Sequence, residues 1–136
     1  IKPKEEKKIT PKKRVENERI RSIKKGIANK FIVKQSDDFA KFWDQILIRL
    51  LEEKYGTSPV HTIDEIILLK NKFPENIKLF TIENDGEILA GTVLFINRNT
   101  VHTQYIGSSE EGKKNGANDL LYHNLITQEY VGARYF

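Results

Sequence analysis

The stretch that decides the fold is residues 77–107, which read IKLFTIENDGEILAGTVLFINRNTVHTQYIG. Three segments of it have the alternating or β-branched apolar composition of strands, and they span residues 77–83, 88–97 and 101–107. Asn84-Asp85-Gly86-Glu87 is typical of a tight hairpin turn, and Arg98-Asn99-Thr100 gives a second polar turn. Because short turns join antiparallel neighbours, the stretch predicts a three-stranded antiparallel meander.

Two helices are expected immediately before the meander. The first begins with Ser36 as its cap, has two aspartates in its first turn and stops at Gly56. Its apolar side chains recur at helical spacing, and they are Phe39, Phe42, Trp43, Ile46, Leu47, Leu50 and Leu51. Thr62 and Glu65 form a capping box that opens the second helix, and Phe73-Pro74 closes it.

The remaining segments complete an α+β order. Thr10-Pro11 begins a basic helix over residues 12–28, and residues 31–33 are a short strand. After the meander the pattern indicates a polar loop, a helix and a strand, over residues 108–119, 120–126 and 134–136. A helix that follows a strand carries the chain to a parallel neighbour, so we expect a mixed, mainly antiparallel sheet flanked by helices.

Length and composition indicate one domain that folds without disulfide cross-links. We expect a basic flexible arm over residues 1–11 and a single domain over residues 12–136, truncated at its C-terminus because the chain stops inside an expected strand. The absence of cysteine excludes disulfides, thiolate metal sites and cysteine nucleophiles. The mean hydropathy is −0.54, and neither a signal-like start nor a membrane-length apolar run is visible. The expected location is therefore the cytoplasm.

Charge is distributed unevenly along the chain. Residues 1–30 hold 12 Lys or Arg against 4 Asp or Glu, while residues 31–136 hold 11 against 15. The basic segment is suited to a nucleic acid, a phosphorylated ligand or an anionic surface. It contains no aromatic side chain for stacking on bases, and a solvated helix face remains the alternative interpretation.

The strand, loop and helix over residues 101–126 carry the clearest chemical signal. Glycines at the start of a helix expose backbone N–H groups, and Lys113 and Lys114 add positive charge at the same place. Such a site suits a pyrophosphate, although the loop contains neither of the standard nucleotide-binding glycine motifs. An ordinary strand-to-helix connection is the alternative.

Several short phrases resemble one branch of the GNAT-like acyltransferase superfamily, the branch related to the FemAB-type peptidoglycan-bridge aminoacyltransferases. The phrases are PVHT at 59–62, FPENIKL at 73–79, AGTV at 90–93, HTQYI at 102–106 and SSEEGKKNGA at 108–117. The resemblance covers roughly residues 20–136. It implies a GNAT-like fold and transfer of an activated acyl group to an amine acceptor, such as one on a sugar or a cell-envelope precursor.

The resemblance also implies a donor and the residues that hold it. The donor is an acyl-CoA, with acetyl-CoA first, and its binding residues are Ile106, Ser108, Lys113, Lys114, Asn115, Gly116 and Ala117. The usual loop pattern in GNAT enzymes is Arg/Gln-x-x-Gly-x-Gly/Ala. Aligning Ala117 with its last position leaves Gly112 in place of Arg/Gln and Asn115 in place of the first glycine.

Two alternatives to an acyl-CoA transferase therefore stay open. One is a FemAB-like reaction with aminoacyl-tRNA as the donor, which the basic residues 19–25 would contact by charge. The other is a non-catalytic, basic-armed domain that binds a polyanion. Neither the acceptor nor the oligomeric state follows from the sequence.

Acyl transfer to an amine needs a base for the acceptor proton and donors for the developing oxyanion. His61 and His102 are the candidate bases, because imidazole exchanges protons near neutral pH. Tyr105 is the candidate acid for the leaving group, and by analogy a backbone amide near residues 106–108 would polarise the carbonyl.

Each of these three residues also has a purely structural alternative. His61 is equally suited to hydrogen bonding in its turn, and His102 and Tyr105 are equally suited to packing in the sheet. His123 is expected on a helix surface. No histidine pair has the spacing of a metal site, so no metal is expected.

Overall fold

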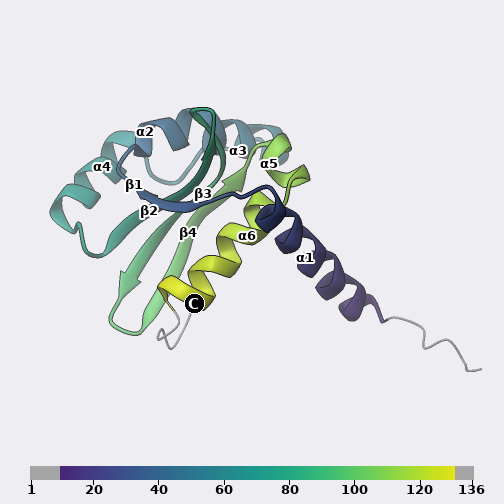
Figure 1. The fold of residues 1–136 in the computed structure, drawn as a ribbon. Coiled ribbons are helices and arrows are strands. Elements are labelled where there is room, and N and C mark those ends of the chain that lie inside the picture. Colours follow the sequence, from purple (N-terminus) through teal and green to yellow (C-terminus); the bar gives the residue numbers. More distant parts are fainter. Residues whose placement is uncertain (1–9, 131–136) are drawn as a thin grey trace, which may run out of the picture.

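The computed structural model describes residues 10–130, which form an α+β fold (Figure 1). The elements, with π-helical segments labelled η, are α1 (Pro11–Ala28), β1 (Val33–Ser36), α2 (Phe39–Phe42), η1 (Trp43–Leu47), α3 (Ile48–Tyr55), α4 (Ile63–Lys72), β2 (Ile77–Asn84), β3 (Glu87–Asn97), β4 (Thr100–Ser108), α5 (Glu110–Lys114), α6 (Ala117–Asn124) and η2 (Leu125–Glu129). Among these helices, none has both the length and the apolar character needed to cross a bilayer.

The predicted meander is confirmed, and β1 adds a fourth strand to it. The strand order is β1-β2-β3-β4, with antiparallel pairing throughout. Asp85 and Gly86 have φ of 53° and 79°, which is the backbone of the two-residue hairpin turn that their sequence predicts. The parallel strand expected at residues 134–136 lies outside the described residues, as does most of the arm expected at residues 1–11.

Helices cover both faces of the sheet and enclose two hydrophobic clusters. The continuous helix α2–η1–α3 and helix α4 lie on one face, and α6 lies on the other, where the C-terminal part of α1 packs against α6 (Figure 1). Phe42, Trp43, Leu79 and Val93 belong to the first cluster, and Ile82, Leu94, Leu121 and Leu125 to the second. The sheet residues alternate between these clusters, so both of its faces are buried.

The local helix signals are confirmed at three of the predicted ends. Thr10 accepts a hydrogen bond from the backbone of Lys13, and Thr62 and Glu65 make both bonds of their capping box. Gly56 ends α3 with φ 58°. Each of these signals depends on groups within four residues of the helix end.

The strand expected at residues 31–33 is wrong in position, because β1 begins at Val33 and ends at Ser36. Ser36 pairs with Leu79 of β2 and therefore belongs to the sheet. Asp38 replaces it as the helix cap and accepts from the backbone nitrogen of Lys41 at 3.1 Å.

The loop expected at residues 108–119 is also wrong, because most of it is helical. Ser109 caps α5 by accepting from the backbone nitrogen of Gly112 at 3.0 Å. A Cβ at Gly112 would lie 1.9 Å from the carbonyl oxygen of Leu89, so this glycine lets α5 press directly onto β3. The helix therefore forms through a cap and a close backbone approach, although its composition is that of a loop.

A pair of opposed glycines lets the helix α2–η1–α3 approach the sheet backbone. Gly91 of β3 faces Gly107 of β4. A Cβ at Gly91 would lie 2.7 Å from the Phe42 ring, and one at Gly107 would lie 2.9 Å from Ile46 and from Leu50. The helix therefore rests on the sheet next to the C-terminal end of β4.

Candidate active site

His61 and Tyr105 form a hydrogen-bonded pair. His61 directly precedes the capping residue of α4, and Tyr105 lies in β4. The tyrosine hydroxyl oxygen is 2.7 Å from Nδ1 of His61 and accepts from the backbone N–H of His61 at 3.0 Å. The Tyr105 side chain is 8% exposed, and its ring packs edge-on against Trp43 with centroids 5.2 Å apart. The imidazole is thereby fixed against a largely buried phenol.

A bulge in β4 places His102 on the same face of the sheet as Tyr105. Val93 pairs with Tyr105 and the next residue, Leu94, pairs with Thr103, so Gln104 is the extra residue. Residues three apart in a regular strand face opposite sides, and the bulge removes that difference. His102 lies opposite Phe95, whose ring centroid is 5.9 Å from that of His61. All three candidate residues therefore share one face.

The hydrogen bonds of Tyr105 allow two proton arrangements for the pair. The backbone N–H of His61 already occupies one lone pair of the phenol oxygen. If Nδ1 carries the imidazole proton, it donates to the phenol, Nε2 is unprotonated and the phenol O–H points to a third partner. If the phenol donates to Nδ1, Nε2 carries the proton. The first arrangement provides both a base and an acid.

A groove of about 390 Å³ lies beyond Tyr105, at the C-terminal end of β4. It is lined by Leu50, Leu51, Lys54, Tyr55, Ile106, Gly107, Ser108, Glu110, Lys113, Asn118 and Asp119. Two lysines and two carboxylates thus face the same space. Gly107, one of the opposed glycines described above, belongs to this lining and lets Leu50 of α3 approach β4.

The groove gathers only some of the residues expected to hold the donor. Ile106, Ser108 and Lys113 line it. Lys114 is exposed outside its lining, although it is the next residue in α5. Side chains one residue apart in a helix point about 100° away from each other, which explains the separation.

The other three expected donor residues contribute to helix packing. The side-chain amide of Asn115 donates to the backbone carbonyl of Glu111, and the backbone carbonyl of Asn115 accepts from the side-chain amide of Asn29. Gly116 is buried beneath α1, where a Cβ would lie 2.0 Å from the carbonyl oxygen of Ser22. Ala117 is fully buried in the second cluster.

The first turn of α5 is occupied by carboxylates of its own chain. Glu110 and Glu111 stand at that end of the helix, where the dipole favours negative charge. The start of α5 therefore carries negative charge, and residues 115–117 are used in packing. The positive charge of the groove comes from its lysine side chains. Among the described residues, no three His, Asp or Glu side chains gather as a metal site.

Three features of this region are not among those predicted from the sequence. Lys54 reaches the groove from α3, one helical turn after Leu50, so helical spacing provides a signal for it. Phe95 of β3 packs edge-on against the ring of His61, which precedes α4, so only the tertiary fold brings the two rings together. The bulge at Gln104 depends on the register of β3 with β4, and no local pattern indicates it.

Comparison with known proteins agrees with this architecture. A family model described as acetyltransferase (GNAT) domain matches residues 12–130. No curated protein matches the chain. The family match spans most of the chain and all of the elements that build the groove and the His61–Tyr105 pair. The chain therefore belongs to the GNAT acetyltransferase domain family, whose chemistry is acyl transfer.

Proposed function

We propose that this protein transfers an acetyl group from acetyl-CoA to an amine acceptor at the His61–Tyr105 pair. The observation that carries the proposal is this pair, which unites a base and an acid next to the lysine-bearing groove. His102, on the same face and exposed, is the second candidate base.

The groove would hold the donor. Lys54 and Lys113 carry the charge that phosphates require, and Ser108, the last residue of β4, offers a hydroxyl in the same groove. β4 lies at the edge of the described sheet, so alternate backbone N–H groups near residues 106–108 point away from β3. One of them would donate to the thioester carbonyl and stabilise the developing oxyanion.

The chemistry follows from the first proton arrangement of the pair. Nε2 of His61 accepts a proton from the amine as its nitrogen attacks the thioester carbonyl. When the tetrahedral intermediate collapses and the C–S bond breaks, Tyr105 gives its hydroxyl proton to the thiolate. Nδ1–H of His61 returns a proton to the phenol across the 2.7 Å contact. The net products are the amide and CoA thiol, and exchange with solvent resets the imidazole tautomer.

The test is titration calorimetry of acetyl-CoA and of CoA into the full chain, followed by a thiol-release assay with a panel of amines. The proposal predicts saturable binding and amine-dependent release of CoA thiol. Absence of binding together with absence of thiol release would overturn it.

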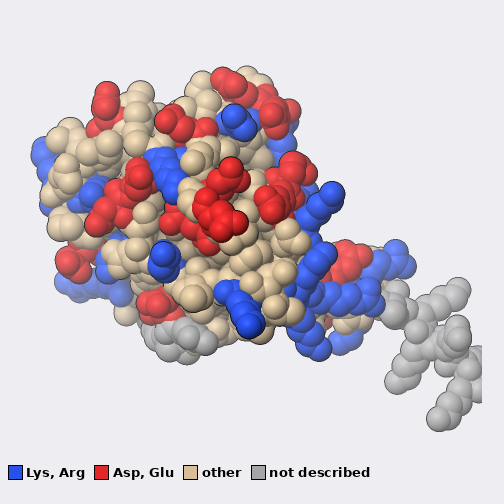
Figure 2. All heavy atoms as spheres, turned by 45° about the horizontal axis from the view of Figure 1, so that its top comes forward, with Lys and Arg blue, Asp and Glu red and all other residues tan. Residues whose placement is uncertain are grey.

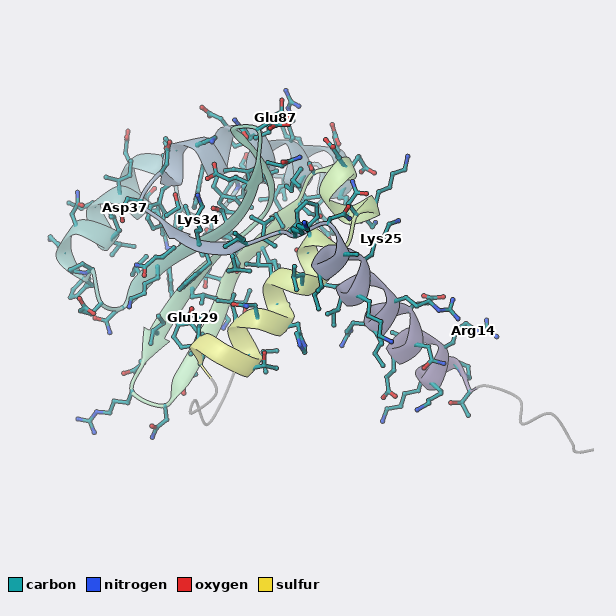
Figure 3. All side chains as sticks on the ribbon, viewed as in Figure 1. Arg14, Lys25, Lys34, Asp37, Glu87 and Glu129 are labelled. Carbon is teal, nitrogen blue, oxygen red and sulfur yellow. The ribbon has the colours of Figure 1, made fainter. Side chains whose placement is uncertain are left out.

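A second candidate function is favoured by the surface of α1. This helix carries seven Lys or Arg against two Glu, and none of the ion pairs among residues 10–130 involves it. Figure 2 shows the basic side chains crowded along α1, and Figure 3 places Arg14 and Lys25 toward its two ends. A polyanion, such as the tRNA of an aminoacyl-tRNA donor, would fit this charge.

The salt dependence of tRNA binding distinguishes the two candidate functions. Binding of bulk tRNA through α1 would weaken steeply with salt, and Arg14→Glu would lower the slope of log affinity against log salt by about 1 to 2. Lys34→Glu, on exposed β1, is the control and would change the slope less. Salt-insensitive binding, or no binding, would remove this candidate.

A further inference from the structure

A second groove opens on the other side of the His61–Tyr105 pair. It has a volume of about 610 Å³ and lies where β3 and β4 approach their shared turn. Its walls include the side chains of Phe73, Ile77, Phe95 and His102. Phe73 follows the last residue of α4 and is 51% exposed, so its ring stands at the rim.

This groove adjoins the candidate active site at Phe95. Phe95 lines it and also contacts the imidazole of His61, with ring centroids 5.9 Å apart. Along β4, His102 lines the apolar groove, Tyr105 meets His61, and Ile106 lines the groove that contains the lysines. The pair therefore stands between two grooves on one strand, which is the arrangement that a reaction of two substrates requires.

The two grooves differ in their chemistry. The groove beyond Tyr105 has lysines and carboxylates, whereas no Asp, Glu, Lys or Arg lines the one at Phe73. The amide nitrogen of Asn76, which also lines it, is already donated to the carbonyl of Ile96 at 2.9 Å. A charged group placed there would lose its hydration without gaining an ionic partner.

We infer that the groove at Phe73 binds the acceptor, a small primary amine that carries an aromatic or branched aliphatic group. The apolar group would lie between Phe73, Ile77 and Phe95, and the amine would reach Nε2 of His61. This inference rests on the proposed acetyl transfer. It disfavours nucleotide-linked sugars and polyamines as acceptors, because their charges would face uncharged walls.

The experiment compares two amine probes on the full chain. Amide chemical shifts are followed by NMR during titration with 2-phenylethylamine and, separately, with ethanolamine. We expect 2-phenylethylamine to shift the amides of Phe95, Thr100 and His102 and to be the better acetyl acceptor, while ethanolamine leaves these signals in place. Phe73→Ala should lower kcat/KM for 2-phenylethylamine about tenfold relative to that for ethanolamine.

Leu68→Ala is the matched control variant. Leu68 lies on α4, is 57% exposed and does not line the groove, so it loses similar apolar area without touching the site. The variant should keep the wild-type ratio between the two amines. Both substitutions leave the backbone hydrogen bonds at the end of α4 intact, including that from Phe73 N–H to Leu69.

The outcomes distinguish this inference from the proposed function. Acetyl transfer without preference between the amines, or a ratio that Phe73→Ala leaves unchanged, overturns the inference and leaves acetyl transfer standing. Shifts elsewhere on the protein also overturn it. Shifts confined to the groove, without any acetyl transfer, support the binding site and count against the proposed reaction.

Discussion

Tyr105 binds His61 at two atoms, because one phenol oxygen lies 2.7 Å from the imidazole Nδ1 and 3.0 Å from the backbone nitrogen. This double contact joins the start of α4 to the middle of β4 across 44 residues of sequence. It fixes both the position of the ring and the direction of Nε2, which has no part in the contact. A histidine held in this way is pre-organised for proton transfer.

The role of His61 can be separated from its contact with Tyr105 by two substitutions. His61→Asn keeps a polar atom near the position of Nδ1 but lacks Nε2, and His61→Ala lacks both. If Nε2 is the base, we expect both variants to lose about 10²- to 10⁴-fold in kcat. Steady-state kinetics with acetyl-CoA and a reactive amine provide the measurement.

Rescue of kcat by asparagine over alanine would show instead that His61 only positions Tyr105. Tyr105→Phe should reduce kcat to a similar extent, and the double variant should be little worse, since one proton path includes both residues. His123→Asn is the control, because His123 is exposed on α6, across the sheet. Melting temperatures of all variants test whether folding accounts for a loss.

The adjacent lysines of α5 provide a matched pair for donor binding. Lys113 lines the groove and Lys114 does not, and both lie in the last turn of the same helix. Reversing the charge of either lysine therefore costs the same interaction with the dipole of α5. We expect Lys113→Glu to weaken CoA binding about tenfold or more and Lys114→Glu about twofold or less, as measured by calorimetry. Equal weakening of CoA binding by the two variants would show that these lysines act only through long-range charge and not through a contact in the groove.

Removal of the charge of Glu110 should have the opposite effect on CoA binding. It lines the groove together with Lys113, and its charge repels a phosphate. Glu110→Gln should therefore tighten CoA binding a few-fold, and the gain should shrink at high salt. Titrations at two ionic strengths check both statements, and weaker binding by this variant would place the phosphates elsewhere.

The sequence predicts those features whose causes lie within a few residues. The hairpin at Asp85-Gly86 and the capping box of Thr62 and Glu65 are local, because backbone dihedrals and side-chain caps decide them. The meander follows from its alternating pattern and its turns. The family resemblance adds the overall architecture, which the family match confirms.

The rest depends on contacts between distant segments. Gln104 bulges because β4 shifts its register against β3, and that shift brings His102 to the face of Tyr105. α5 forms where composition indicates a loop, since Gly112 can rest on the carbonyl of Leu89. His61 and Tyr105 are chosen from the sequence separately, each for its own chemistry, and only the fold brings them into contact.

The close approach of α5 to β3 predicts a large stability cost for a single methyl group. Gly112→Ala would place Cβ 1.9 Å from a backbone oxygen, so α5 or β3 must move. We expect a loss of about 3 kcal/mol or more in the free energy of unfolding, measured by urea denaturation. Gly86→Ala is the control, because its φ is +79° but nothing lies within 4 Å of the added Cβ.

Gly86→Ala should lower the free energy of unfolding by about 1–2 kcal/mol through backbone strain alone. Gly112→Ala should also weaken CoA binding, because a displaced α5 carries Lys113 away from the groove. Equal destabilisation by the two variants would contradict the close packing of α5 on β3.

The partly buried phenol of Tyr130 should make the protein less stable at alkaline pH. Burial, and secondly the negative charge of Glu129, raise the pKa of this phenol above its ordinary value of 10.0. The unfolded chain therefore releases the proton first as the pH rises. The contribution to stability is fully present below pH 10.0 and is lost as the pH rises through the higher folded-state pKa.

Tyr130→Phe should accordingly flatten the fall of unfolding free energy as the pH rises above 10.0. The ring itself stays in place, because a phenylalanine keeps the edge-on contact with Phe80, whose centroid lies 6.1 Å away. Comparison of the two proteins at about pH 8 measures what the hydroxyl contributes apart from its ionisation. An unchanged alkaline slope in the variant would assign the pH dependence to other groups.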